Sequence, residues 1–190
     1  YLLQEMNSAA AGNLREFDAA FFDHAKMLMS NLARAKLHAW TAARLARNPM
    51  SYPEGRYYQH LTRLSAAFAT VSEAALLLLG GELKRRESLS ARLGDALSNL
   101  YLASAVLKRY SDQGRMQADL PLLEWSMHHL MFLIQDSLID VLDNLPGGVT
   151  GRILRLALFP FGRSFRKPDD DVMRRADVAL LLIDGEEGIT

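Results

Sequence analysis

The chain has 190 residues, a length that suits one domain with a trailing extension and allows a hydrophobic core that needs no metal or disulfide. Its 22 basic and 22 acidic residues cancel, which argues against a nucleic-acid-binding domain because such domains usually carry a basic excess. It contains no cysteine, which excludes disulfides, thiolate catalysis, iron–sulfur clusters and cysteine-type zinc sites, and fits a reducing cytosol.

The start of the chain shows no targeting pattern. Tyr1 stands where an initiator Met is expected, and the residues after it lack the basic and apolar regions of a signal peptide. We therefore expect the chain to be a piece of a longer protein, although processing would give the same start. The longest apolar run, Ala74 to Leu79, is far shorter than the roughly 20 residues that a membrane-spanning helix needs.

The first helical pattern begins at Asn13, an N-cap residue with the acid Glu16 three positions later. Apolar and small residues then recur in steps of three and four, which predicts one continuous helical face. We expect this helix to end near Arg47, because proline follows at Pro49 and the residue before a proline avoids the helical region.

Three more helical patterns follow. The second covers about residues 56–79 and is stopped by Gly80-Gly81, since glycine readily adopts the left-handed cap conformation. The third begins between residues 82 and 90 and ends at residue 114. The fourth covers about residues 119–145, with Pro121 in its first turn.

These patterns predict an all-α fold, since no stretch alternates as a strand does. Four long helices with mostly short connections are typical of an up-down-up-down four-helix bundle, here over residues 13–146. Residues 147–190 are expected to form a short C-terminal helical extension of the same domain. Within it we expect helices over 152–159 and 172–184, and a frayed end over 185–190.

No motif in the chain declares a reaction. There is no glycine-rich phosphate loop after a strand, and no serine elbow. Glu124 and His128 share a helical face with His129 beside them, so they are either a packed or solvated pair or a fragment of a metal site. We assign no catalytic, cofactor-binding or metal residues.

Two polar sets allow two interpretations each. One set, either boundary residues of the helix seam or a row that meets a partner domain, comprises His24, Asn31 and His38. The other set is basic and interleaved with acids, so it forms either a salt-linked helix junction or a site for the phosphates of coenzyme A. Its members are Lys84, Arg85, Arg86 and Arg92.

A third set mixes cations and aromatic residues without an acid, a combination that favours contact with an anionic membrane surface. The same composition also suits a segment that packs on the bundle or on another domain. This candidate membrane or partner surface comprises Arg152, Arg155, Phe159, Phe161, Arg163, Arg166 and Lys167.

Several blocks in order resemble the helical domain that follows the catalytic core of bacterial acyl-CoA dehydrogenases of fatty-acid β-oxidation. The blocks are RYYQHL (56–61), LGGELKRRE (79–87), SARLGD (90–95), LYLASAVLKRY (100–110), ADLPL (118–122) and FPFGR (159–163). They span about residues 17–168, and the resemblance fades after residue 169.

The resemblance implies a parent oxidoreductase that acts on a CH–CH bond. In that family an N-terminal core uses a carboxylate to take the α-proton of an acyl thioester while FAD accepts the β-hydride. The motifs of that core have no counterpart here, so the resemblance implies FAD in the parent enzyme and a non-catalytic role for this chain.

The implied partners are the N-terminal catalytic core, an anionic inner-membrane surface, and a second copy of the chain. The implied location is the bacterial cytoplasm, peripherally on the inner membrane. The alternative is a stand-alone helical bundle that serves as a protein-interaction or dimerisation module.

Overall fold

In the computed structural model, residues 2–48 and 54–187 are described, and all of their regular structure is helical. The all-α prediction is therefore confirmed for these residues. The helices are α1 (Leu2–Ala10), α2 (Leu14–Trp40), α3 (Glu54–Leu79), α4 (Glu87–Asp112), α5 (Leu120–Asp143), α6 (Val149–Leu158) and α7 (Asp170–Glu187). Two 3₁₀ turns, η1 (Gly80–Lys84) and η2 (Gln117–Asp119), join α3 to α4 and α4 to α5.

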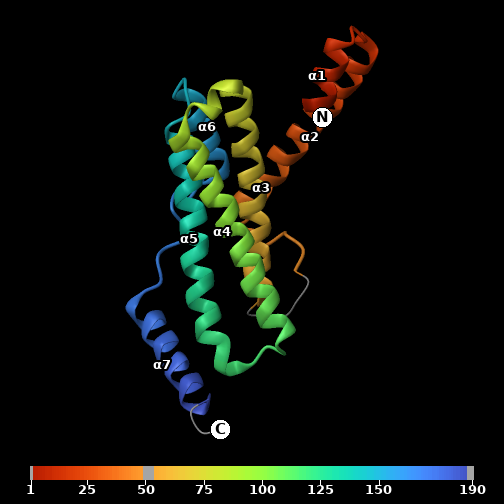
Figure 1. Cartoon of the computed structure of the whole chain (residues 1–190). Helices are drawn as coiled ribbons and strands as arrows, with labels where there is room; N and C mark the ends of the chain where they lie inside the picture. Colours follow the sequence, from red (N-terminus) through yellow and green to blue (C-terminus); the bar gives the residue numbers. More distant parts are fainter. Residues whose placement is uncertain (1, 49–53, 188–190) are drawn as a thin grey trace.

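Helices α3, α4 and α5 pack against one another and form the core (Figure 1). Their facing side chains are completely buried, and each buried aliphatic side chain contributes about 1.5–3 kcal/mol. The large ones include Leu64, Val71, Leu107, Met127, Ile134 and Leu138. Helices α3, α4 and α5 run alternately in opposite directions, as the short connections between them require.

The finer prediction of a four-helix bundle over residues 13–146 is not confirmed. Helix α2 packs on α3, α1 and α6, whereas α4 packs on α5 and α3, and α5 packs on α4, α7 and α3. Figure 1 shows α2 leaving the α3–α4–α5 core at an angle and carrying α1 beyond it. The arrangement is a three-helix core with α2 along one side.

The start and stop signals act largely as expected. The side chain of Asn13 accepts a hydrogen bond from the Glu16 amide at 3.4 Å, and Gly80 ends α3 at φ +50°. Asp169 caps α7 by accepting from the Val172 amide at 2.9 Å. Helix α7 continues to Glu187, so the expectation of fraying from residue 185 was wrong up to that residue; residues 188–190 lie outside the described part.

The end of α2 differs from the prediction, which placed it near Arg47. The helix stops at Trp40, and Ala42 and Ala43 adopt positive φ angles. This turn directs backbone carbonyls toward α3, where the Ala42 carbonyl accepts from the Arg56 guanidinium at 2.7 Å. Tertiary hydrogen bonds thus outweigh a local preference for helix. Helix α1 was not predicted at all.

One helix, Glu54–Lys84, is long and apolar enough to cross a membrane, with a mean hydropathy of 1.6 over its most apolar window. That stretch is longer than the uninterrupted apolar run of residues 74–79 because it also includes small and polar residues. In the structure this stretch comprises α3 and η1, and α3 contacts α2, α4 and α5 as a core helix of a bundle does.

Helix α6 approaches α5 so closely that only glycine fits at Gly151. A Cβ added there would collide with the backbone carbonyl of Leu142. We predict that Gly151→Ala lowers the free energy of unfolding by about 1–3 kcal/mol, because α6 must move away from α5. Urea unfolding followed by circular dichroism measures this change.

The matched control is Gly94→Ala in the middle of α4, where an added Cβ meets no atom within 4 Å. There the lower backbone entropy of alanine should stabilise the chain by about 0.5–1 kcal/mol. Equal effects of the two substitutions would show that α6 does not pack as described.

Candidate functional site

The segment between α6 and α7 is fixed to the core by one buried amide, that of Gln135 on α5. Its Nε2 donates to the Phe165 carbonyl at 3.0 Å, and its Oε1 accepts from the Phe165 amide at 3.1 Å. The Ser164 hydroxyl also donates to this oxygen at 3.2 Å. The Gln135 side chain therefore bonds both the amide and the carbonyl of Phe165, as a neighbouring β-strand would, and holds residues 164–165 against α5.

The predicted membrane or partner surface is not one continuous exposed patch. Phe159 is only 3% exposed and belongs to the core, so its assignment to a surface is wrong. Arg155 binds Asp143 at 2.6 Å, and Arg163 forms ion pairs with Asp136 and Asp140. Residues 149–167 contain no acid, but α5 supplies three, and this pairing was hidden because α5 lies apart from Arg155 and Arg163 in the sequence.

The other four members of that set have different surroundings. Arg152 and Phe161 are exposed. Lys167 places its Nζ over the ring of Phe132 on α5, 5.4 Å from the centroid. Arg166 lines a cavity between α3, α5 and the α6–α7 segment. Whether any of them meets a membrane stays a prediction.

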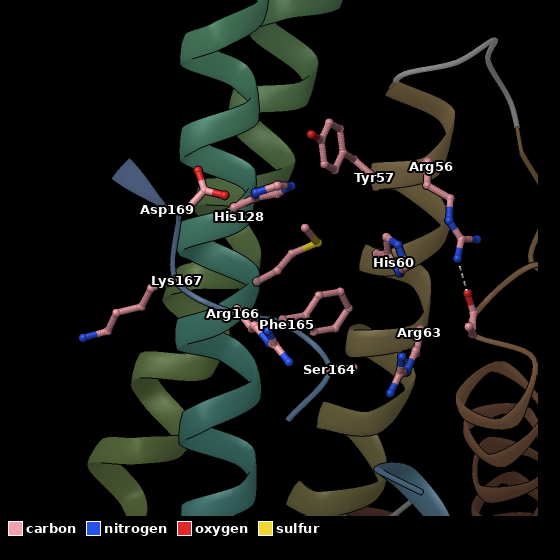
Figure 2. Close-up of a pocket in the computed structure, with 12 residues that line it drawn as sticks. Arg56, Tyr57, His60, Arg63, His128, Ser164, Phe165, Arg166, Lys167 and Asp169 are labelled. Carbon is pink, nitrogen blue, oxygen red and sulfur yellow. Dashed lines mark hydrogen bonds between the residues drawn. The ribbon is translucent and has the colours of Figure 1, made fainter. Parts of the chain in front are cut away.

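That cavity has a volume of about 630 Å³ and is the candidate site (Figure 2). Figure 2 shows Tyr57, His60 and Arg63 on α3 and His128 on α5 lying in the space between the two helices, with Phe165 among them. The complete lining is Ala42, Arg56, Tyr57, His60, Arg63, His128, Met131, Ser164, Phe165, Arg166, Lys167 and Asp169.

The spacing of α3 explains why its polar residues share the cavity. Arg56, His60 and Arg63 are separated by four and three residues, so they lie on one helical face. Sequence reasoning missed this set, although the spacing was readable, because an apolar seam on the same helix dominated the pattern. Phe165 fixes two of these side chains: its ring packs edge-on against His60 at 5.1 Å and lies 5.5 Å from the Arg63 guanidinium carbon.

The cavity is electropositive. Four of its lining residues are Arg or Lys, and Asp169, which caps α7, is the one acid among them. Burial lowers the pKa of Arg63, and the charge of Arg56 lowers it further, but a guanidinium remains charged at neutral pH. The positive environment therefore persists across the physiological range.

The same environment keeps His60 neutral. Burial lowers the pKa of His60 to about 4, and the nearby charges of Arg56, Arg63 and His128 act in the same direction. Its Nδ1 makes no hydrogen bond to any residue in the described part of the chain. A neutral imidazole is thus held next to two guanidinium groups.

The low pKa of His60 makes stability depend on pH. In the unfolded chain this histidine titrates near 6.5, so between pH 6.5 and 4 the unfolded state binds more protons than the folded state. We predict that the free energy of unfolding falls as pH falls through this window, by up to about 3 kcal/mol from His60 alone.

Urea unfolding at pH 7 and pH 4.5 measures this loss in the wild type and in His60→Gln. The variant should lose less stability than the wild type, because glutamine does not titrate. His38, whose pKa burial also lowers, contributes equally to both proteins and cancels in the comparison. Identical losses in the two proteins would contradict the assignment.

Several of the remaining polar candidates from the sequence contact side chains of the same or a neighbouring helix. Buried His24 contacts Glu5 of α1 at 2.8 Å and Glu73 of α3 at 3.5 Å, while Asn31 accepts from Arg34 and His38 is buried. These contacts agree with the first interpretation, in which the three residues border the apolar seam of α2. Arg85 pairs with Glu82 at 3.0 Å, which fits the salt-linked junction.

Two further observations concern metals. Glu124 binds Arg175 of α7 at 3.2 Å, and the ring of His129 stacks on Trp125 at 5.3 Å. Over residues 2–48 and 54–187, no group of three or more acidic or histidine side chains is arranged to hold a metal ion.

A comparison with protein-family models matches residues 1–186 to the family described as acyl-CoA dehydrogenase, C-terminal, bacterial type. The match covers α1 to α7 and therefore includes both the cavity and the tail, where the resemblance read from the sequence fades. No solved structure matches the chain.

Proposed function

The chain belongs to the family of C-terminal domains of bacterial-type acyl-CoA dehydrogenases, and from that premise we propose that it is a non-catalytic helical domain that packs on the enzyme's FAD-dependent catalytic core. The family implies both FAD and the core in the parent enzyme. On this proposal the acyl thioester is oxidised in the core, and this chain contributes to assembly. The stand-alone interaction module remains the alternative.

The observation that carries the proposal is a second apolar face on α2. Phe22, Met29 and Trp40 are 68%, 66% and 54% exposed, and their spacing of seven and eleven residues aligns them on one side of the helix. The buried residues of α2, such as Ala35 and His38, lie on the other side. Because α2 packs on the rest of the chain through its other side, this exposed apolar stripe has no role in that packing.

Single exposed apolar residues are common, but an aligned stripe of aromatic residues and methionine has the composition of an interface core. Burying each of these side chains contributes about 1.5–3 kcal/mol. The stripe is extended by an apolar groove of about 270 Å³ between α2, α3 and α6, which Met29, Leu32, Leu77 and Leu154 help to line. Together they form a surface suited to a large partner.

We predict that Phe22→Ser with Trp40→Ser weakens binding of the separately expressed catalytic core to this chain by at least about 100-fold, because two buried anchors are lost. Isothermal titration calorimetry measures the dissociation constant. The stability of the chain alone should not fall, since both side chains are exposed in it.

Leu97→Ser with Tyr101→Ser on α4 is the matched control, because these two side chains are equally exposed apolar residues on another face. It should leave the affinity unchanged. A core that binds the α2 variant as tightly as the wild type would remove α2 from the interface, whereas a core that does not bind the wild-type chain would favour the stand-alone module.

We further propose that α6 attaches the enzyme peripherally to the anionic inner membrane from the cytoplasm. Val149, Ile153 and Leu156 are exposed and lie on one side of α6, with Arg152 beside them, while Gly151 and Leu158 face the core. An exposed apolar stripe with a flanking cation is the pattern of a helix that lies in a lipid interface. The same stripe would also serve contact between two copies of the chain.

We predict that the chain binds vesicles of phosphatidylglycerol more strongly than vesicles of phosphatidylcholine, and that Ile153→Ser with Leu156→Ser reduces binding at least about tenfold. Co-sedimentation measures the bound fraction, and Leu97→Ser serves as the control for an exposed leucine elsewhere. Unchanged sedimentation of the α6 variant would exclude the attachment. A molecular mass that rises with concentration in the wild type but not in the α6 variant would point to dimerisation through this stripe.

A further inference from the structure

The cavity between α3 and α5 contains a buried charge without a partner. Arg63 is only 3% exposed, yet its Nε and Nη2 make no hydrogen bond to any residue in the described part of the chain. Buried ionised groups are normally paired, because desolvation without compensation is costly. The contact with the Phe165 ring offsets part of this cost but satisfies no N–H donor.

The two free nitrogens are the ones that matter for recognition. Nε and Nη2 form one edge of the guanidinium, and this edge donates two parallel hydrogen bonds to a pair of oxygens on one phosphate or carboxylate group. Arg56 cannot provide the same fork, because its Nη1 and Nη2 donate to Gln59 and to the Ala42 carbonyl. Arg63 is thus the side chain prepared to bind an anion.

The surroundings favour an anion from outside the chain. Arg56, Arg166 and Lys167 add positive charge, and the one acid of the lining caps α7. The volume of about 630 Å³ lies within the range of small-molecule pockets, about 300–1,000 Å³, and far exceeds what a bare phosphate fills.

We propose that this cavity binds a small organic phosphate, whose oxygens accept two hydrogen bonds from the Nε–Nη2 edge of Arg63. Arg166 at the rim adds a second cation. The organic part of the ligand lies against Tyr57, Phe165 and Met131, which supply aromatic and apolar surface. This site is separate from the α2 and α6 surfaces, so the proposal stands independently of the proposed function.

The test is a thermal-shift and calorimetric titration of the chain with inorganic phosphate, adenosine monophosphate, adenosine and acetate. Phosphate and the nucleotide should raise the melting temperature, the nucleotide at lower concentration, whereas adenosine should have no effect. Vesicles containing phosphatidic acid form a separate arm: binding there that depends on Arg63 identifies a lipid headgroup as the source of the phosphate. A response to acetate as strong as that to phosphate would overturn the choice of phosphate.

Variants assign the response to the cavity. Arg63→Met removes the uncompensated charge, so it should fold with an equal or higher melting temperature and lose the response to phosphate. Arg63→Lys keeps the charge without the fork and should bind at least about tenfold more weakly. Arg166→Gln should weaken binding several-fold, and the exposed Arg85→Gln should have no effect.

Two results would overturn the proposal. The first is a full phosphate response in both Arg63 variants. The second is a loss of phosphate response in Arg85→Gln as large as that in the Arg63 variants, which would show that positive charge elsewhere on the chain accounts for binding. Because Arg166 is exposed, its variant keeps the test decisive even if an Arg63 variant does not fold.

Discussion

The arrangement of the C-terminal third depends on the side chain of Gln135. This amide is completely buried in α5, and its only way to avoid an unsatisfied donor or acceptor is to bond with the backbone of Phe165 and the hydroxyl of Ser164. The contact fixes Phe165 against His60 and Arg63, closes one wall of the cavity and sets the path toward α7. A polar group in the core thus specifies where an irregular segment lies, which apolar packing alone would leave free.

Charge complementarity then orients the same segment. Arg155 and Arg163 meet Asp143, Asp136 and Asp140 on the exposed side of α5, while Phe159 enters the core. Exposed ion pairs contribute little to stability, about 0–1 kcal/mol each, so the buried phenylalanine and Gln135 provide most of the attachment. The basic and aromatic composition that favoured a membrane surface therefore serves packing in large part, and the outward stripe of α6 is what remains for a lipid or protein partner.

Local signals in the sequence predicted the order of the four long helices but not α1, nor how the helices are arranged. The N-cap at Asn13, the proline in the first turn of α5 and the left-handed Gly80 act on neighbouring residues, so the chain order of the long helices could be predicted. The early end of α2 could not be predicted, because it depends on hydrogen bonds from Arg56 and Gln59 to carbonyls that lie 14 and 13 residues away, respectively.

The candidate site was beyond prediction for the same reason. Its walls come from α3, α5 and the α6–α7 segment, and Gln135 reaches across 30 residues to Phe165. The face of α3 that carries Arg56, His60 and Arg63 was visible as a spacing. Only the fold shows that a buried guanidinium lies there.

Two features of the chain leave stabilising interactions unused: the outward apolar stripe of α2, and the buried edge of Arg63. Proteins are stable by only about 5–15 kcal/mol, so features that cost stability are retained mainly where they serve a partner. The two features differ in kind. An apolar stripe is stabilised by contact with any large apolar surface, which suits a permanent neighbour such as a catalytic core. The two N–H donors on the Nε–Nη2 edge of Arg63 form hydrogen bonds only with oxygens that lie in the plane of the guanidinium, which suits a small ligand that binds reversibly. On these two proposals the helical domain has two separate roles, attachment to the catalytic core through α2 and binding of a small phosphate between α3 and α5.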